Sequence, residues 1–94
     1  MAQLGYRVMD TQIFNLKLSV LATSAYILIC SLVGEGLLAS DQAILERWNE
    51  SHENLQAALV ELQLWRVIEK RNGPEEKVSW SPNPASLWRV PGTL

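Results

Sequence analysis

The sequence predicts a mainly α fold with a small β-hairpin, in which three helices precede a sheet of two to three strands. The clearest evidence is the segment 51–71, where the spacing of apolar residues changes from helical to strand-like. Its first part has the i, i+3, i+4, i+7 spacing of one buried helix face, made by Leu55, Ala58, Leu59, Leu62 and Trp65. Ser51, directly before this helix, is a typical N-cap residue. A strand from Val67 to Arg71 is expected to follow.

The composition is that of a globular chain without a strong charge of either sign. The 94 residues are 48% hydrophobic and 19% charged, with a formal net charge of −2, which indicates one domain with one core. No overall positive field attracts the molecule to nucleic acid or to an anionic membrane, so any such binding has to be local. A single cysteine, Cys30, cannot form a disulfide within the chain and is read as a small buried hydrophobe, which fits a cytoplasmic protein.

An uncharged run of 17 residues lies between Lys17 and Glu35, and a membrane span or a secretory signal is an alternative interpretation of it. The run is at the short end of what crosses a bilayer, and three serines and one threonine dilute it. A signal peptide usually has a shorter apolar stretch of about 7 to 15 residues. A buried first helix over 16–33 is therefore preferred, and no membrane interaction is expected.

Residues 1–15 are expected to form an N-terminal arm, with Asp10 and Asn15 as candidate caps for the helix that follows. In that helix the apolar residues form one stripe, namely Leu18, Leu21, Ala25, Leu28, Ile29 and Leu32. Other apolar residues lie off the stripe, namely Val20, Tyr26, Ile27 and Cys30. A helix that is apolar nearly all round is buried on more than one side. The arm, the C-terminal tail and a second copy of the chain are the alternatives for the second cover.

The first helix is expected to end at 34–36, where a glycine can adopt the left-handed C-terminal conformation. Residues 37–39 then leave room for a stub of strand. Ser40 is the expected cap of a second helix over 41–48, and 49–50 form the turn before the third helix.

Strands at 67–71 and 77–81 are expected to pair as a hairpin. The tip between them begins with Asn72-Gly73, which supplies the positive backbone angles of a tight turn. Residues 82–94 form a tail whose large apolar side chains are expected to pack on the domain or on a partner.

The order of helix, short connection, helix, helix and hairpin resembles the winged helix-turn-helix superfamily. The residues that carry the resemblance are ASDQAILERWN and SHENLQAALVELQLWRVIEKRNG, within a predicted domain over 16–81. Many members have a glycine before the first wing strand, where this chain has Arg66, so the third helix is expected to end differently or one residue later. The resemblance implies a DNA-binding module whose third helix enters the major groove and whose wing contacts the backbone.

The charges of the third helix do not favour DNA. No Lys or Arg lies between residues 51 and 65, and over residues 40–65 five acids and one base leave a net charge of −4. Such a surface repels the phosphates that dominate DNA affinity. The acids are Asp41, Glu46, Glu50, Glu53 and Glu61.

The positive charge lies on the hairpin instead, at Lys70, Arg71 and Lys77. These residues are the main candidates for DNA contact, and a homodimer would present two such wings. Further candidates, for a phosphate or for adenine edges, are His52, Asn54 and Gln56. The competing interpretation is a solvated hairpin whose charges keep its edge soluble.

The leading functional prediction is a small DNA-associated, transcription-type regulator that acts as a homodimer, and the alternative is a protein interaction module. The alternative depends on an apolar strip flanked by acids on the third helix, which suits a protein surface better than a duplex. The candidate interface residues are Ala57, Val60, Leu64, Tyr26, Ile27 and Trp88.

An enzyme is not expected. One histidine and one cysteine cannot build a histidine-based metal site or relay. The glycines at 34 and 36 lack the further glycine and the lysine of a phosphate-binding loop. No metal, cofactor or small-molecule ligand is therefore predicted.

Overall fold

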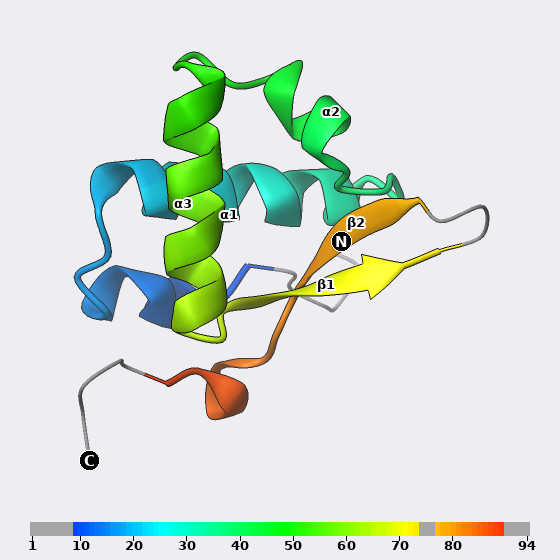
Figure 1. Cartoon of the computed structure of the whole chain (residues 1–94). Helices are drawn as coiled ribbons and strands as arrows, with labels where there is room; N and C mark the ends of the chain where they lie inside the picture. Colours follow the sequence, from blue (N-terminus) through cyan, green and yellow to red (C-terminus); the bar gives the residue numbers. More distant parts are fainter. Residues whose placement is uncertain (1–8, 74–76, 90–94) are drawn as a thin grey trace, which may run out of the picture.

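The computed structural model describes residues 9–73 and 77–89, which form three α-helices and one antiparallel hairpin (Figure 1). In chain order the elements are η1 (Thr11–Asn15), α1 (Val20–Gly34), α2 (Asp41–Leu45), α3 (His52–Leu64), β1 (Ile68–Asn72), β2 (Val78–Pro82) and η3 (Ala85–Leu87). Here η1 and η3 are short 3-10 helices. The predicted arrangement of helices followed by a small hairpin is confirmed.

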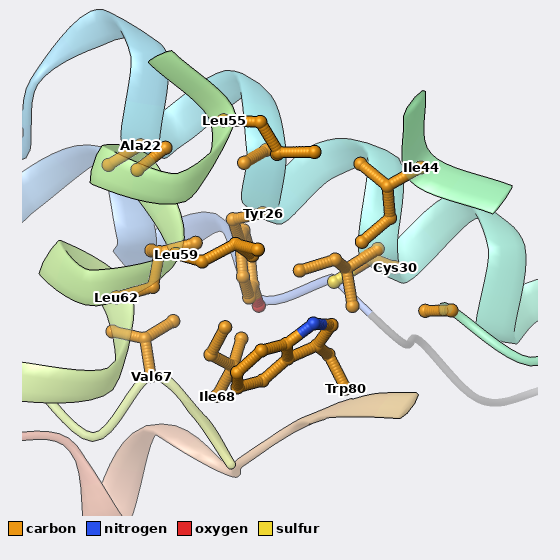
Figure 2. Packing of buried hydrophobic residues seen from close by; sticks show 14 of the residues in the cluster. Ala22, Tyr26, Cys30, Ile44, Leu55, Leu59, Leu62, Val67, Ile68 and Trp80 are labelled. Atoms are coloured by element: carbon orange, nitrogen blue, oxygen red, sulfur yellow. The ribbon is translucent and has the colours of Figure 1, made fainter. Parts of the chain in front are cut away.

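Helix α1 is the central element. It packs against α2, α3 and β2, and in Figure 1 α3 crosses in front of it. Side chains from these elements and from β1 meet around Tyr26, among them Ile44, Leu59, Ile68 and Trp80 (Figure 2). One hydrophobic cluster therefore holds the helices and the hairpin together.

The start of α1 differs from the prediction. The helix begins at Val20, because Ser19 caps it and the Ser19 hydroxyl accepts a hydrogen bond from the first turn. Lys17, with a φ of 61°, turns the chain just before the cap. Asp10 caps η1, and Asn15 is the last residue of η1, so neither of them caps α1.

The end of α1 is as predicted. Gly36 has a φ of 81°, and the Leu37 N–H donates to the Leu32 carbonyl at 2.9 Å. This is a Schellman motif, in which the left-handed glycine lets the chain reverse over the last turn.

The buried face of α1 is shifted from the predicted stripe, because Leu18, Leu21 and Leu28 of the stripe are only partly buried. Tyr26 and Cys30, which were expected outside the stripe, lie in the core with exposed fractions of 0% and 4%. The other two residues expected outside it, Val20 and Ile27, are 80% and 38% exposed. The difference arises because β2 as well as α3 packs on this helix.

The arm and the tail both contact the second buried side of α1. The Asp10 N–H donates to the Tyr26 hydroxyl at 3.0 Å, and the Trp88 ring meets the Tyr26 ring edge to face at 6.2 Å between centroids. The Trp88 indole N–H donates to the Asn83 carbonyl, and the Arg89 N–H donates to the Trp65 carbonyl at 2.7 Å. The rest of the predicted arm and tail, residues 1–8 and 90–94, lies outside the described residues.

Helix α2 is shorter than the predicted 41–48, since it ends at Leu45 and the chain continues in a turn. Ser40 caps it as predicted, and Ile44 is fully buried. The predicted strand stub at 37–39 is not a strand.

Helix α3 has the predicted cap and the predicted buried face. The Ser51 hydroxyl accepts from the Asn54 N–H at 3.1 Å. The buried residues are Leu55, Ala58, Leu59 and Leu62. Trp65 follows as the C-cap and is partly buried.

The junction between α3 and β1 is a left-handed turn at Arg66, whose φ is 58°. The Arg66 N–H donates to the Gln63 carbonyl at 3.0 Å, and the Val67 N–H donates to the Leu62 carbonyl at 2.9 Å. This is again a Schellman motif, so the helix ends in the geometry that glycine usually supplies, with arginine in its place. The Asn83 side chain donates to the Arg66 carbonyl at 3.0 Å and holds the turn from the other end of the hairpin.

The two strands begin one residue later than predicted, at Ile68 and Val78. β1 begins later because Val67 still takes part in the turn that ends α3, where its N–H bonds to the Leu62 carbonyl. Lys70 lies opposite Trp80 in the hairpin register, and the Trp80 N–H donates to the Ala39 carbonyl on the far side of β2 at 2.9 Å.

Among residues 9–73 and 77–89, no helix has the length and apolar character needed to cross a bilayer.

The left-handed turn predicts that Arg66→Gly raises the free energy of unfolding by about 0.5 to 1 kcal/mol, because a side chain at positive φ is strained. The matched control is Gln63→Gly in the last turn of α3, which should lower the same quantity by about 0.5 to 1 kcal/mol. Urea unfolding followed by circular dichroism measures both. Destabilisation by Arg66→Gly would contradict the turn geometry.

The buried thiol predicts a loss of stability at alkaline pH. Burial raises the pKa of Cys30 to about 11 and also raises the pKa of Tyr26. As the pH rises, the unfolded chain therefore releases these protons before the folded chain does. The contribution of the protonated groups to the free energy of unfolding is fully present below about pH 9. It is lost as the pH rises through 11, at up to about 1.4 kcal/mol per pH unit for each group. Urea unfolding between about pH 8 and about pH 10.5 should show a shallower decline in Cys30→Ala than in the wild type. Parallel declines would count against the prediction.

Candidate functional site

The outward face of α3 carries an apolar strip among polar residues. Val60 and Leu64 are 53% and 64% exposed, and Ala57, one turn before Val60, is exposed too. Glu53 is exposed at the start of the same helix. The helical spacing of the sequence predicts these residues on the face of α3 opposite the buried residues. One residue predicted for that face is an exception.

The exception is Glu61, which was predicted to lie with the outward acids but is engaged with α1. Its two carboxylate oxygens accept from the Ser19 N–H at 2.9 Å and from the Ser19 hydroxyl at 2.7 Å. A carboxylate at the first turn of a helix also interacts favourably with the helix dipole. Glu61 therefore joins α3 to the start of α1, and α3 has one outward acid fewer than its sequence indicates.

A groove of about 560 Å³ separates α3 from the hairpin. Its apolar lining comes from Leu59, Val60, Val78 and Trp80. Its polar lining comes from Ser40, Asp41, Gln42, Gln56, Gln63 and Lys70. The groove thus has an apolar floor with one acid and one base beside it.

Asp41, at the start of α2, orders one wall of this groove. Its carboxylate accepts from the Trp80 indole N–H at 2.6 Å and from the Gln56 side-chain amide at 3.3 Å. Because Trp80 is nearly buried and its N–H is satisfied, the ring is held in a fixed position. The Asp41 side chain is therefore a structural acid as well as a surface charge.

The three residues at the start of α3 that were predicted as DNA contacts have other neighbours. The Gln56 amide lies 3.2 Å from the His52 ring nitrogen and also reaches Asp41. Asn54 is half-buried, and its N–H is the donor to the Ser51 cap. The His52 and Gln56 side chains are thus engaged within the chain, whereas the bond from Asn54 comes from its backbone.

The hairpin carries the other predicted DNA contacts, with Lys70 and Arg71 on opposite faces of β1. Lys70, Arg71 and Lys77 are all exposed. The Lys70 ammonium lies 5.7 Å from the centre of the Trp80 ring, and the Arg71 guanidinium pairs with Glu69 at 3.0 Å. The positive charge of β1 is therefore partly balanced on the hairpin itself. Residues 74–76 of the tip lie outside the described residues.

The one base between residues 40 and 65 is also paired. Arg47 binds the Glu35 carboxylate through both terminal nitrogens, at 2.9 Å each. This guanidinium lowers the pKa of Glu35, and the carboxylate raises the pKa of Arg47. The pair joins the end of α1 to the turn after α2.

The residues predicted for a protein interface do not form one surface. Ala57, Val60 and Leu64 lie together on α3, whereas Ile27 lies on α1. Tyr26 was predicted to lie at an interface, but it is fully buried, and its hydroxyl accepts a hydrogen bond from the arm. Trp88 is partly buried against Tyr26.

A second exposed apolar region lies on α1, and of its residues the sequence singled out only Ile27 as an interface candidate. A groove of about 370 Å³ is lined by Val20, Leu21, Ser24, Ile27, Leu28, Arg47, Trp48, Asn49 and Glu50. Phe14 of η1 is 55% exposed in an adjoining hollow that shares Val20. The all-round apolar pattern of α1 signalled an additional surface, but spacing alone did not tell which residues the hairpin would cover.

No group of three or more His, Cys, Asp or Glu side chains that could hold a metal occurs in the described part of the chain.

Comparison of the chain with protein-family models, with curated proteins and with solved structures found no match. A function for this chain is therefore inferred from the geometry of these surfaces.

The contact between Glu61 and Ser19 predicts that Glu61→Gln lowers the free energy of unfolding by about 1 to 2 kcal/mol, because an amide cannot accept both hydrogen bonds with the strength of a carboxylate. The matched control is Glu53→Gln in the first turn of α3, which loses only an interaction with the helix dipole and should lower the same quantity by about 0.3 to 1 kcal/mol. Urea unfolding measures both variants. Equal effects would show that the tie to α1 contributes nothing.

Proposed function

We propose that this chain is a non-enzymatic binding module of the winged-helix type, with α3 as its recognition helix and the hairpin as its wing. Three observations support the assignment. The element order is that of the superfamily, the Trp80 N–H bonds to Ala39 where a third strand would pair, and Arg66 has the left-handed conformation of the usual glycine. A cytoplasmic location is part of this proposal, on the ground that the one cysteine is a buried thiol.

The partner that the surface favours is a protein. The observation that carries this is the outward face of α3, where Val60 and Leu64 are exposed and no Lys or Arg occurs from His52 to Trp65. A duplex requires cations near its phosphates, whereas a protein partner gains from burying exposed apolar side chains. The groove beside Val60 adds a concave surface with an apolar floor.

DNA is the second candidate, and the exposed Lys70, Arg71 and Lys77 favour it. In this alternative the wing contacts the phosphate backbone, and a homodimer presents two wings. Two of the three cations already have contacts within the hairpin, at Trp80 and at Glu69, which weakens the case. Exposed contacts of this kind are weak, so they reduce the attraction without abolishing it.

The test measures both partners on the same variants. Peptides selected from a random displayed library should bind the wild type and lose at least about tenfold in affinity in Val60→Glu, because a charge is placed on the apolar face. The triple variant Lys70→Ala, Arg71→Ala, Lys77→Ala is kept for the DNA arm, because Lys70 lines the groove. The double variant Arg71→Ala, Lys77→Ala should bind these peptides within about threefold of the wild type. Circular dichroism confirms that each variant is folded.

Duplex DNA is titrated in parallel at two salt concentrations. Protein binding as the main function predicts no saturable duplex binding at physiological salt. Duplex affinity that falls steeply with salt and is lost in the triple alanine variant, without any peptide dependence on Val60, would overturn the protein assignment in favour of DNA.

A further inference from the structure

The outer edge of β1 carries backbone groups that the hairpin does not use. The Gly73 N–H donates to the Lys77 carbonyl at 2.6 Å, and the Asn83 N–H donates to the Val67 carbonyl at 2.8 Å. In an antiparallel pair the hydrogen-bonded residues alternate with non-bonded ones. With this register the bonded pairs continue at Arg71 with Ser79 and at Glu69 with Ser81.

The residues between them point their backbone groups outward. On β1 these are Ile68, Lys70 and Asn72, and on β2 the equivalent Trp80 N–H already bonds to Ala39. No hydrogen-bond partner for the backbone of these three β1 residues occurs in residues 9–73 and 77–89. Figure 1 shows β2 between β1 and the connection from α1 to α2, so the free edge of the sheet belongs to β1. A free edge of this kind is a template for another strand.

The side chains along this edge select their partner by charge. Glu69 and Arg71 share the face opposite Ile68 and Trp80, where they pair at 3.0 Å. If two copies of β1 pair antiparallel about a twofold axis at Lys70, Glu69 of each copy lies opposite Arg71 of the other. Moving the axis to Glu69 would oppose two carboxylates, and moving it to Arg71 would oppose two guanidinium groups. One register out of the three therefore brings opposite charges together.

We propose that the free edge of β1 pairs with the same strand of a second copy, in antiparallel register centred on Lys70, to form a four-stranded sheet across a homodimer. Ile68 then bonds with Asn72 of the second copy, and Lys70 bonds with its own equivalent. Charges on an edge strand discourage pairing with unrelated strands. Here they favour an antiparallel second copy of β1, because it places Glu69 of one copy opposite Arg71 of the other. This surface is separate from the outward face of α3, so the inference does not depend on the proposed protein partner.

The two Lys70 side chains oppose this pairing, because like charges lie directly across from each other. Each ammonium lies 5.7 Å from the Trp80 ring of its own chain, on the face that carries the groove. An axis normal to the sheet keeps both Trp80 rings on one face. The dimer therefore presents two α3–hairpin grooves on the same side.

The experiment measures mass in solution by sedimentation equilibrium from about 1 µM to about 300 µM, since a short strand edge gives a Kd on the order of 10 to 100 µM. The wild type should pass from monomer to dimer over this range. Glu69→Arg and Arg71→Glu should each weaken the dimer at least about tenfold, because each places like charges across the axis. Lys70→Thr should tighten it, since the backbone groups remain and the repulsion is removed.

The decisive arm mixes the two weakened variants. Strands with Arg at both 69 and 71 and strands with Glu at both positions are complementary in the proposed register, so an equimolar mixture of Glu69→Arg and Arg71→Glu should form a heterodimer detected by native mass spectrometry. Circular dichroism and urea unfolding show that each variant is folded before mixing. Restoration by mixing cannot come from the contact between Glu69 and Arg71 within one strand.

Three outcomes would overturn the proposal: a wild type that stays monomeric over the whole range, a mixture that yields no heterodimer, or a dimer that survives Glu69→Arg and is lost in Val20→Glu. The last result would assign the dimer to the exposed face of α1. Loss of peptide binding to Val60→Glu tests the proposed function separately, so the two can fail independently.

Discussion

The left-handed turn at Arg66 is the constraint on which the arrangement of the hairpin depends. It ends α3, sends the chain back toward the core at Val67 and sets the direction in which β1 leaves the helix. A side chain at positive φ is unfavourable, so the surrounding contacts have to hold it. They come from both sides, since the Val67 N–H bonds back to Leu62 and the Asn83 amide bonds to the Arg66 carbonyl. The groove between α3 and the hairpin follows from that direction.

Several charges in this chain act first as structural groups. Glu61 holds the start of α1, Asp41 fixes the Trp80 ring and Glu35 binds Arg47. Each contact joins elements that are distant in sequence. The net charge of residues 40–65 is therefore a poor map of the surface that a partner meets. What remains outward on α3 is the apolar strip of Ala57, Val60 and Leu64 beside Glu53 and three uncharged polar side chains, and this strip is the basis for proposing a protein partner.

The hairpin has two roles that do not compete. Its inner face, with Ile68 and Trp80, completes the core and forms one side of the groove. Its outer edge presents backbone groups and an alternating charge pattern. The tail adds to the same core, because Trp88 packs on Tyr26 and Arg89 bonds to Trp65. A small domain gains stability from such additional cover, since its own core is limited.

The sequence by itself determined the order and type of the main elements and the buried face of α3, because caps such as Ser40 and Ser51 and the helical spacing of Leu55 to Leu62 are local signals. The glycine end of α1 is local in the same sense. The tertiary structure decided that Tyr26 is core and Val20 is surface, because the apolar pattern of α1 contains no record of where β2 will pack. It also decided that Glu61 binds the Ser19 cap of α1 and that, within residues 9–73 and 77–89, only β2 pairs with β1, since both depend on contacts between residues far apart in the chain.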